Sequence, residues 1–505
     1  MMTGIDLIHS SDIHSSQKFS KTRLPISQRA ISMLCALLLI FAAGTIAAHA
    51  QTFTLLASFN GTNGSNPGGL VQGPDGNLYG VASGGAHKDG EIYRITPEGV
   101  ITTLYSFCSL ANCADGSAPS PLTVGLDGDL YGTTLFAGHS APNTVGGTIY
   151  KITTSGTFTT LYSFCGQTCG DGIGPGGLIL GNSGNFFGGT GKGGAHNFGT
   201  IFEITPKGVL TTLYNFCSKT NCSDGESPTD LVLAANGMFY GTSFGATETT
   251  STFFRMTNKG VLTTIANICN ANCGSGEAEV ASLLQGPNGN FYGENYDGGA
   301  GGGAIVEMTP KGVQTTLYTF CFATKCPDGS GPAGGLAFAT DGNFYGTTLA
   351  GGEPDQGHRC EPFCGTIYQI SPQGAFTTVY RFCPVNPCTD GSRPDFLLQA
   401  TDGNIYGTAS ESGTKNNGTV FKLDIGAAPF VRTLTPSGDI GAKIVILGMN
   451  LTGTTAVTFN GTPATFTVVA PGEVTAKVPA GATTGTIQVT TTGGILSSNV
   501  PFKIP

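Results

Sequence analysis

A short segment, an apolar residue followed by an aromatic residue and glycine, recurs seven times along this chain of 505 residues. The copies are Leu78-Tyr79-Gly80, Leu130-Tyr131-Gly132, Phe186-Phe187-Gly188, Phe239-Tyr240-Gly241, Phe291-Tyr292-Gly293, Phe344-Tyr345-Gly346 and Ile405-Tyr406-Gly407. Their glycines are separated by 52, 56, 53, 52, 53 and 61 residues. A repeat of about fifty residues is typical of β-propellers, in which each repeat forms one four-stranded sheet. The repeat therefore predicts an all-β fold with seven sheets.

Each copy is expected to supply four strands joined by tight turns. In the first copy they are expected at 69–71, 78–80, 92–95 and 101–107, with turns at 75–77 and 96–99. Asp-Gly and Asn-Gly turns provide the positive φ angles that tight hairpins require. The last of these segments, ITTLYSF, alternates apolar and polar residues as a half-buried strand does.

The two ends of the array are complementary. Residues 53–59 (FTLLASF) match the fourth strand of a repeat, but no strands one to three precede them. The last repeat stops after its third strand, at 419–423. We therefore expect 53–59 to complete the sheet that contains 395–423, which closes a ring and removes exposed sheet edges. An open stack of sheets is the alternative.

The DGNxYG and GxIYxITPxG…TTLYSF segments of the repeat, over residues 53–424, resemble the GloVer (Gloeo/Verruco) tandem-repeat family of exported bacterial proteins. The resemblance implies a surface or secreted location and supplies no catalytic residues.

Residues 428–505 lack cysteine, are rich in Thr, Val and Gly, and resemble an IPT/TIG domain, an immunoglobulin-like β-sandwich. The expected architecture is a seven-bladed β-propeller over 51–425, closed by an N-terminal strand, followed by this sandwich.

The first fifty residues are expected to be a signal peptide. Basic residues precede an apolar run at 31–47, which ends at a small-residue cleavage site, Ala48-His49-Ala50. A transmembrane anchor is the alternative. The net charge of −9 includes +2 from this segment, so an acidic mature chain without a basic stripe remains. We expect a secreted, cell-surface or periplasmic protein that is monomeric, does not span a membrane and binds no nucleic acid.

Fourteen cysteines follow the predicted signal peptide as seven close pairs. Six pairs come after predicted fourth strands, and the seventh lies in the longest loop: Cys108/Cys113, Cys165/Cys169, Cys217/Cys222, Cys269/Cys273, Cys321/Cys326, Cys383/Cys388 and Cys360/Cys364. Even pairing in an exported protein predicts local disulfides. Zinc sites are the alternative, but each pair lies in a separate loop. No metal or cofactor is expected.

Two further motifs have an ordinary structural interpretation. An Asp-Gly pair follows five of the cysteine pairs, at Asp115, Asp171, Asp224, Asp328 and Asp390. Calcium requires six or more oxygens, so a turn into the next sheet is the preferred interpretation of these single carboxylates. The G-x-S-x-G match around Ser243 lacks the helix that a nucleophile elbow requires, and Ser243 occupies an ordinary repeat position.

Ligand binding is expected on the end of the ring where the longer loops emerge. Variable loops on a rigid frame are where binding usually occurs. The candidate ligand-face residues are His87, His139, His196, His358, Arg359 and Glu361. We expect a non-catalytic binding or scaffolding module for an extracellular polysaccharide or protein. An extracellular polysaccharide lyase or hydrolase that uses the same loops is the alternative.

Overall fold

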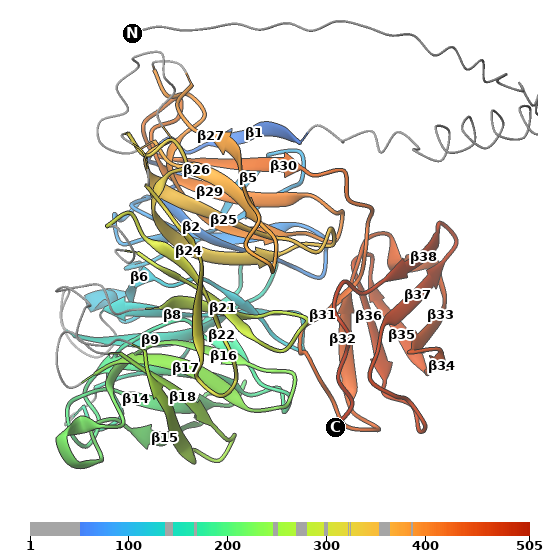
Figure 1. Cartoon of the computed structure of the whole chain (residues 1–505), viewed down its shortest axis with the longest axis horizontal. Helices are drawn as coiled ribbons and strands as arrows, with labels where there is room; N and C mark the ends of the chain where they lie inside the picture. The colour runs from blue at the N-terminus through green and yellow to red at the C-terminus, as the bar shows by residue number, and fades with distance from the viewer. Residues whose placement is uncertain are drawn as a thin grey trace, which may run out of the picture. The chain divides into compact units, whose positions relative to one another are not determined.

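Antiparallel β-strands make up the computed structural model, which describes residues 51–136, 145–165, 169–245, 251–268, 280–296, 301–321, 323, 325–352, 364–384 and 387–505 (Figure 1). The predicted signal peptide, residues 1–50, lies outside these residues. Residues 51–505 belong to one compact unit. The described helices are short 3-10 turns at Ala111–Cys113, Thr220–Cys222 and Leu451–Gly453. None of them is long and apolar enough to cross a membrane.

The described part of the repeat region forms seven antiparallel sheets, one for each aromatic-glycine copy. The first three sheets consist of β2 (Ser65–Gln72), β3 (Leu78–Ser83), β4 (Glu91–Ile95) and β5 (Ile101–Ser106); β6 (Ser117–Pro119), β7 (Thr123–Val124), β8 (Leu130–Phe136), β9 (Val145–Ile152) and β10 (Phe158–Ser163); and β11 (Ile173–Pro175), β12 (Ile179–Leu180), β13 (Phe186–Lys192), β14 (Thr200–Ile204) and β15 (Leu210–Asn215).

The next four sheets have the same order. They consist of β16 (Glu226–Leu233), β17 (Phe239–Phe244), β18 (Ser251–Met256) and β19 (Leu262–Asn267); β20 (Ala281–Gln285), β21 (Phe291–Asn295), β22 (Ala304–Met308) and β23 (Gln314–Thr319); β24 (Ser330–Phe338), β25 (Phe344–Ala350), β26 (Thr366–Ile370) and β27 (Phe376–Arg381); and β28 (Ser392–Gln399), β29 (Ile405–Glu411), β30 (Thr419–Asp424) and β1 (Thr52–Ser58).

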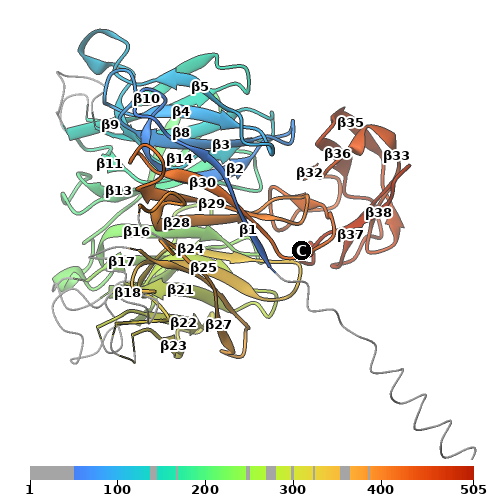
Figure 2. The ribbon, with the colours of Figure 1, turned by 90° about the horizontal axis from the view of Figure 1, so that it is seen from above.

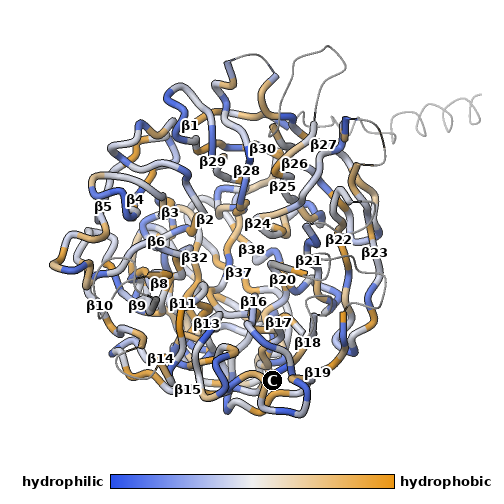
Figure 3. The backbone as a smooth tube through the Cα atoms, turned by 90° about the vertical axis from the view of Figure 1, so that its left-hand side faces the viewer, coloured by the Kyte–Doolittle hydropathy of each residue, from blue (hydrophilic) through white to orange (hydrophobic). Residues whose placement is uncertain are grey.

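The sheets stand around a common axis, with their first strands inside and their fourth strands outside (Figure 3). Each sheet contacts the next through its inner strands, and β2 of the first sheet also contacts β28 and β29 of the seventh. The sheets therefore form a propeller-like ring. We call its two ends the loop end, where the second-to-third-strand and sheet-to-sheet connections emerge, and the turn end, which carries tight turns such as 73–77.

β1 pairs with β30 and completes the seventh sheet (Figure 2). Phe53 lies opposite Leu423 in the antiparallel register, and Thr54 lies opposite Lys422. The Phe53 ring stacks on Tyr380 of the sixth sheet, with centroids 3.9 Å apart. Phe158 stacks in the same way on Tyr105, also at 3.9 Å. β1 therefore makes the contact of an ordinary fourth strand, and the sequence prediction of closure is confirmed.

The aromatic-glycine anchor is explained by packing inside each sheet. A Cβ at Gly80 would lie 2.5 Å from the Tyr93 hydroxyl oxygen, so only glycine leaves space for the tyrosine of the next strand. The anchor tyrosine is itself fully buried, and the Tyr79 hydroxyl donates a 2.7 Å hydrogen bond to Asp75 in the preceding turn. Tyr131, Tyr345 and Tyr406 donate equivalent bonds to Asp127, Asp341 and Asp402.

The residues after the ring form two further four-stranded sheets. One contains β31 (Arg432–Thr433), β32 (Lys443–Leu447), β36 (Glu473–Lys477) and β35 (Phe466–Ala470), and the other contains β34 (Thr462–Pro463), β33 (Thr454–Phe459), β37 (Ile487–Thr491) and β38 (Gly494–Ser497). They share one apolar core. The Gly472 amide donates to the Pro74 carbonyl at 3.1 Å, and the Phe430 amide donates to Thr401 at 3.0 Å. These sheets therefore contact the turn end.

Replacement of Phe53 by alanine tests the closing strand. The variant loses the stack on Tyr380, so we expect the free energy of unfolding to fall by roughly 2–4 kcal/mol. Leu55→Ala is the matched control on the same strand, because Leu55 is 36% exposed. We expect the control to change the free energy by less than about 1 kcal/mol. Urea unfolding followed by circular dichroism measures both, and equal midpoints for F53A and the wild type would contradict closure.

Candidate functional site

At the loop end, a disulfide-bonded turn follows the fourth strand in several of the sheets. Five of the expected pairs are bonded: Cys108–Cys113, Cys165–Cys169, Cys217–Cys222, Cys321–Cys326 and Cys383–Cys388. The expected Cys269–Cys273 and Cys360–Cys364 pairs include residues outside the described part of the chain. Asp89 lies close to the sulfurs of Cys108 and Cys113, but bonded sulfurs offer no thiolate to a metal ion.

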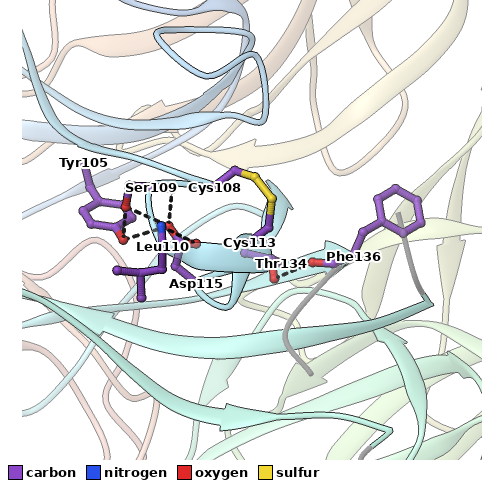
Figure 4. The surroundings of a disulfide bond; sticks show 8 residues. All are labelled: Tyr105, Cys108, Ser109, Leu110, Cys113, Asp115, Thr134 and Phe136. Carbon is purple, nitrogen blue, oxygen red and sulfur yellow. Dashed lines mark hydrogen bonds between the residues drawn. A yellow bond between two sulfur atoms is a disulfide. The ribbon is translucent and has the colours of Figure 1, made fainter. Parts of the chain in front are cut away.

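An aspartate holds each described disulfide turn in place, as Figure 4 shows for Asp115 at the Cys108–Cys113 turn. Asp115 accepts hydrogen bonds from the Tyr105 hydroxyl at 2.8 Å and from the Ser109 amide at 2.9 Å. Tyrosine hydroxyls donate in the same way to Asp171, Asp224, Asp328 and Asp390, at 2.6–2.9 Å. Each of the five carboxylates also accepts from a backbone amide of its own turn. The structure favours the turn interpretation over a calcium site.

Ser243 is an interior residue of β17. Its side chain is 1% exposed, and its hydroxyl lies 2.6 Å from the Thr252 hydroxyl on the neighbouring strand. Thr134 and Thr148 form the equivalent pair in the second sheet, at 2.8 Å. The G-x-S-x-G match is therefore an ordinary repeat position, as the sequence suggested.

The candidate ligand-face residues are only partly described. His87 and His196 are exposed in the second-to-third-strand loops of the first and third sheets. In the described part of the chain no contact joins these two imidazoles, which belong to sheets that are not neighbours. His139, His358, Arg359 and Glu361 lie outside the described residues. Ligand binding by these residues stays a prediction.

Exposed aromatic side chains from several sheets lie at the loop end, a feature that the sequence reasoning missed. Phe136, Phe198 and Phe244 are each 39% exposed, and Tyr296 is 49% exposed. They come from the second, third, fourth and fifth sheets. Phe136, Phe244 and Tyr296 lie at or just after the end of the second strand, and Phe198 lies just before the third strand. A Cβ built on Gly331 would lie 2.8 Å from the Tyr296 ring, so this ring lies against the start of β24 in the next sheet. For Phe244 and Tyr296 the available signal was an aromatic residue three positions after the anchor glycine, where the other repeats carry serine, glycine or leucine.

Glu294 is a second missed residue. It occupies the position of Thr133, Thr242 and Thr408 in other sheets, whose hydroxyls donate to a backbone carbonyl of the next sheet. Glu294 reverses that bond, because its Oε2 accepts from the Gly335 amide at 2.9 Å. Its Oε1 accepts from the Tyr368 hydroxyl at 2.6 Å. The bond between neighbouring sheets is thus kept with donor and acceptor exchanged.

The environment of Glu294 favours its protonated form. Its side chain is 1% exposed, and burial raises the pKa to about 7 against the opposing effect of its two hydrogen bonds. The negative charge of Asp395 raises the pKa further. Burial also raises the pKa of Asp395, whose carboxylate accepts from the Phe396 amide. A buried carboxyl with a pKa near neutrality is a feature of many catalytic sites, but this one is enclosed by its own sheets.

A cavity of about 250 Å³ lies at the turn end, opposite the expected ligand face. It is bordered by turns of the first and seventh sheets and by Met449 and Asn450. Three carboxylates line it: Asp75, Glu98 and Asp402. Asp75 accepts from the Tyr79 hydroxyl and Asp402 accepts from the Tyr406 hydroxyl, both at 2.7 Å, whereas Glu98 is exposed.

Comparison with known proteins gives one family match. The family model described as Gloeobacter/Verrucomicrobia repeat matches residues 42–245 and 227–467. No curated protein matches the chain. Among solved structures, a putative gluconolactonase is 12% identical with a TM-score of 0.37, over 59% of this chain and 89% of that chain.

Two other solved structures have higher TM-scores. Puromycin hydrolase is 13% identical with a TM-score of 0.47, over 77% of this chain and 59% of that chain. The extracellular domain of a putative hybrid two-component system from B. thetaiotaomicron is 12% identical with a TM-score of 0.47, over 88% of this chain and 53% of that chain.

The pH dependence of stability tests the Glu294 environment. Because its pKa is raised in the folded state, the folded protein retains this proton while the unfolded chain loses it. We expect the free energy of unfolding to fall by roughly 3 kcal/mol from Glu294 alone as the pH rises from about 4.5 to about 7. Glu294→Gln should remove this component, whereas Glu98→Gln, at an exposed site, should retain it. Identical pH profiles of E294Q and the wild type would contradict the assignment.

Proposed function

Because the chain belongs to the Gloeobacter/Verrucomicrobia repeat family, we propose a function that rests on its repeat: an exported seven-bladed β-propeller that binds extracellular polysaccharide at its loop end and performs no chemistry. The proposed domains are a signal peptide at 1–50, the propeller at 51–425 and an IPT/TIG-like, immunoglobulin-like sandwich at 428–505. The seven sheets, the closing strand β1 and the two C-terminal sheets support this division.

The disulfides support a location outside the cytoplasm. Five pairs are bonded, and each pair is separated by only four or five residues in the sequence. Disulfides persist in oxidising compartments and are rare in the cytosol. They cross-link the turns that connect one sheet to the next. Export would place the chain in an oxidising compartment, where these cross-links form and make the turns rigid.

The exposed aromatic side chains of the loop end are the reason for proposing polysaccharide as the ligand. Phe136, Phe198, Phe244 and Tyr296 are distributed over four sheets, where they leave apolar surface in contact with water. Exposed apolar groups on loops of a rigid frame mark interaction sites. A sugar ring offers a flat C–H face to such a side chain and hydroxyl groups to the polar loops around it. Separated aromatic groups suit a chain of sugar rings better than one contiguous protein interface.

The position of Glu294 supports binding without chemistry. A catalytic acid or base must lie within hydrogen-bond reach of the substrate proton that it transfers. Glu294 is 1% exposed, and both of its oxygens accept bonds from the protein. Its raised pKa is explained by packing between neighbouring sheets rather than by a substrate site.

Substitution of the aromatic residues tests the proposed function. We expect Phe136→Ala, Phe244→Ala and Tyr296→Ala each to weaken binding to a polysaccharide identified on a glycan array by about tenfold, as expected for loss of one aromatic contact. Val100→Ala and Val261→Ala are matched controls, because these valines are 60% and 64% exposed in turns at the opposite end. Affinity electrophoresis and a reducing-end assay provide the readouts.

Two results would overturn the proposal. Binding that survives the aromatic substitutions and fails in the valine variants would place the ligand at the turn end. Release of new reducing ends by the wild type would establish a hydrolase or lyase in place of a binding module.

A further inference from the structure

Apolar side chains line a cavity on the ring axis, separate from the loop-end surface. Its volume is about 320 Å³, and its walls include Val71, Leu122, Leu178, Leu233 and Leu398 from the inner parts of five sheets. A second cavity of about 340 Å³ shares Leu122, Thr123, Leu178 and Ile179 with the first, so the two spaces adjoin. Volumes of this size lie at the lower end of the range for small-molecule sites.

One charged side chain lines these spaces. Among the described residues that border the two cavities, Arg432 is the only ionisable one. It belongs to β31, which follows the ring, and its backbone pairs with Leu447 in the antiparallel register. Two residues further on, Leu434 packs against the cores of the first three sheets. The pairing with Leu447 and the packing of Leu434 therefore hold this strand at Arg432 and just after it, which fixes Arg432 at the cavity.

The guanidinium of Arg432 has no described acceptor. Its Nε is buried without a hydrogen-bond partner, and no described ion pair includes it. Burial lowers the pKa of Arg432 to about 10, which leaves the side chain protonated at neutral pH. Buried charges in proteins are normally paired and hydrogen-bonded, because an isolated charge is strongly disfavoured away from water. Arg432 as a whole is partly exposed and lines the cavity, so an anion in that space would supply the partner that the described protein groups do not.

We propose that the axial cavity binds a small organic carboxylate, with its carboxylate on Arg432 and its apolar part among the leucine side chains. The planar guanidinium matches a carboxylate in charge and in fork geometry. A single arginine neutralises one negative charge, so a dianionic phosphate would leave excess charge among apolar walls. Methyl and methylene groups of the lining provide an apolar surface for the rest of the ligand. This site is independent of polysaccharide binding at the loop end.

A pair of matched probes tests the proposal on the chain that starts at residue 51. 4-Fluorobenzoate carries the carboxylate, and 4-fluorobenzamide is its neutral counterpart of similar shape. We expect saturable binding of the benzoate by ¹⁹F nuclear magnetic resonance and a melting temperature that rises with its concentration. We expect at least tenfold weaker binding of the benzamide, because it lacks the charge that pairs with Arg432.

Arg432→Met separates this site from a general salt effect. We expect R432M to lose benzoate binding and, without any ligand, to melt at a higher temperature than the wild type, because an apolar side chain of similar length replaces an unpaired charge. Arg255→Met is the matched control, since Arg255 is exposed on β18. R255M should bind benzoate like the wild type.

Several outcomes would overturn the proposal. They are the absence of benzoate binding to the wild type, equal affinity for the two probes, and unchanged benzoate binding by R432M. If R432M fails to fold, Arg432→Lys retains the charge without the fork. We then expect at least tenfold weaker benzoate binding by R432K, and wild-type affinity would contradict the role of the guanidinium. Polysaccharide binding at the loop end should be unchanged in R432K and R432M, which separates this proposal from the proposed function.

Discussion

The pairing of β1 with β30 is the contact on which the ring depends. Each sheet packs against its two neighbours, so the first and seventh sheets need one another as partners. The closing strand comes from residues 52–58, and the strand that it joins comes from residues 419–424. Closure across this sequence separation carries a loop-entropy cost that grows only slowly with length. The backbone bonds between β1 and β30 and the Phe53–Tyr380 stack offset that cost, and the stack recurs as Phe158–Tyr105 and Phe376–Tyr318.

The repeat made much of this fold predictable from sequence. The aromatic-glycine anchor requires glycine because the tyrosine of the neighbouring strand occupies the space of a Cβ, as at Gly80 and Tyr93. The closing strand was expected at 53–59 and is found at 52–58. The five described disulfides join the expected neighbours, because each lies within one turn of one repeat. Local patterns of this kind need no knowledge of how distant sheets meet.

The features that sequence reasoning missed depend on contacts between segments far apart in the chain. Glu294 is visible in the sequence only as a departure from threonine, and its partners Gly335 and Tyr368 belong to the next sheet. The isolation of Arg432 depends on where β31 meets the inner strands of the ring. Phe136, Phe198, Phe244 and Tyr296 lie at one end of the ring because the loops of four successive sheets emerge there. In each case the sequence gives the residue type, but the contacts of that residue depend on the fold.

Hydrogen exchange of the β1 amides tests ring closure most directly. If β1 is a working fourth strand, its amides are protected by the ladder to β30, and protection should equal that of β27, the fourth strand of the sixth sheet. Exchange followed by mass spectrometry on peptides that cover 52–58 and 376–381 gives the comparison. We predict similar protection factors for the two peptides. Rapid exchange over 52–58 with strong protection over 376–381 would contradict closure by the N-terminal strand.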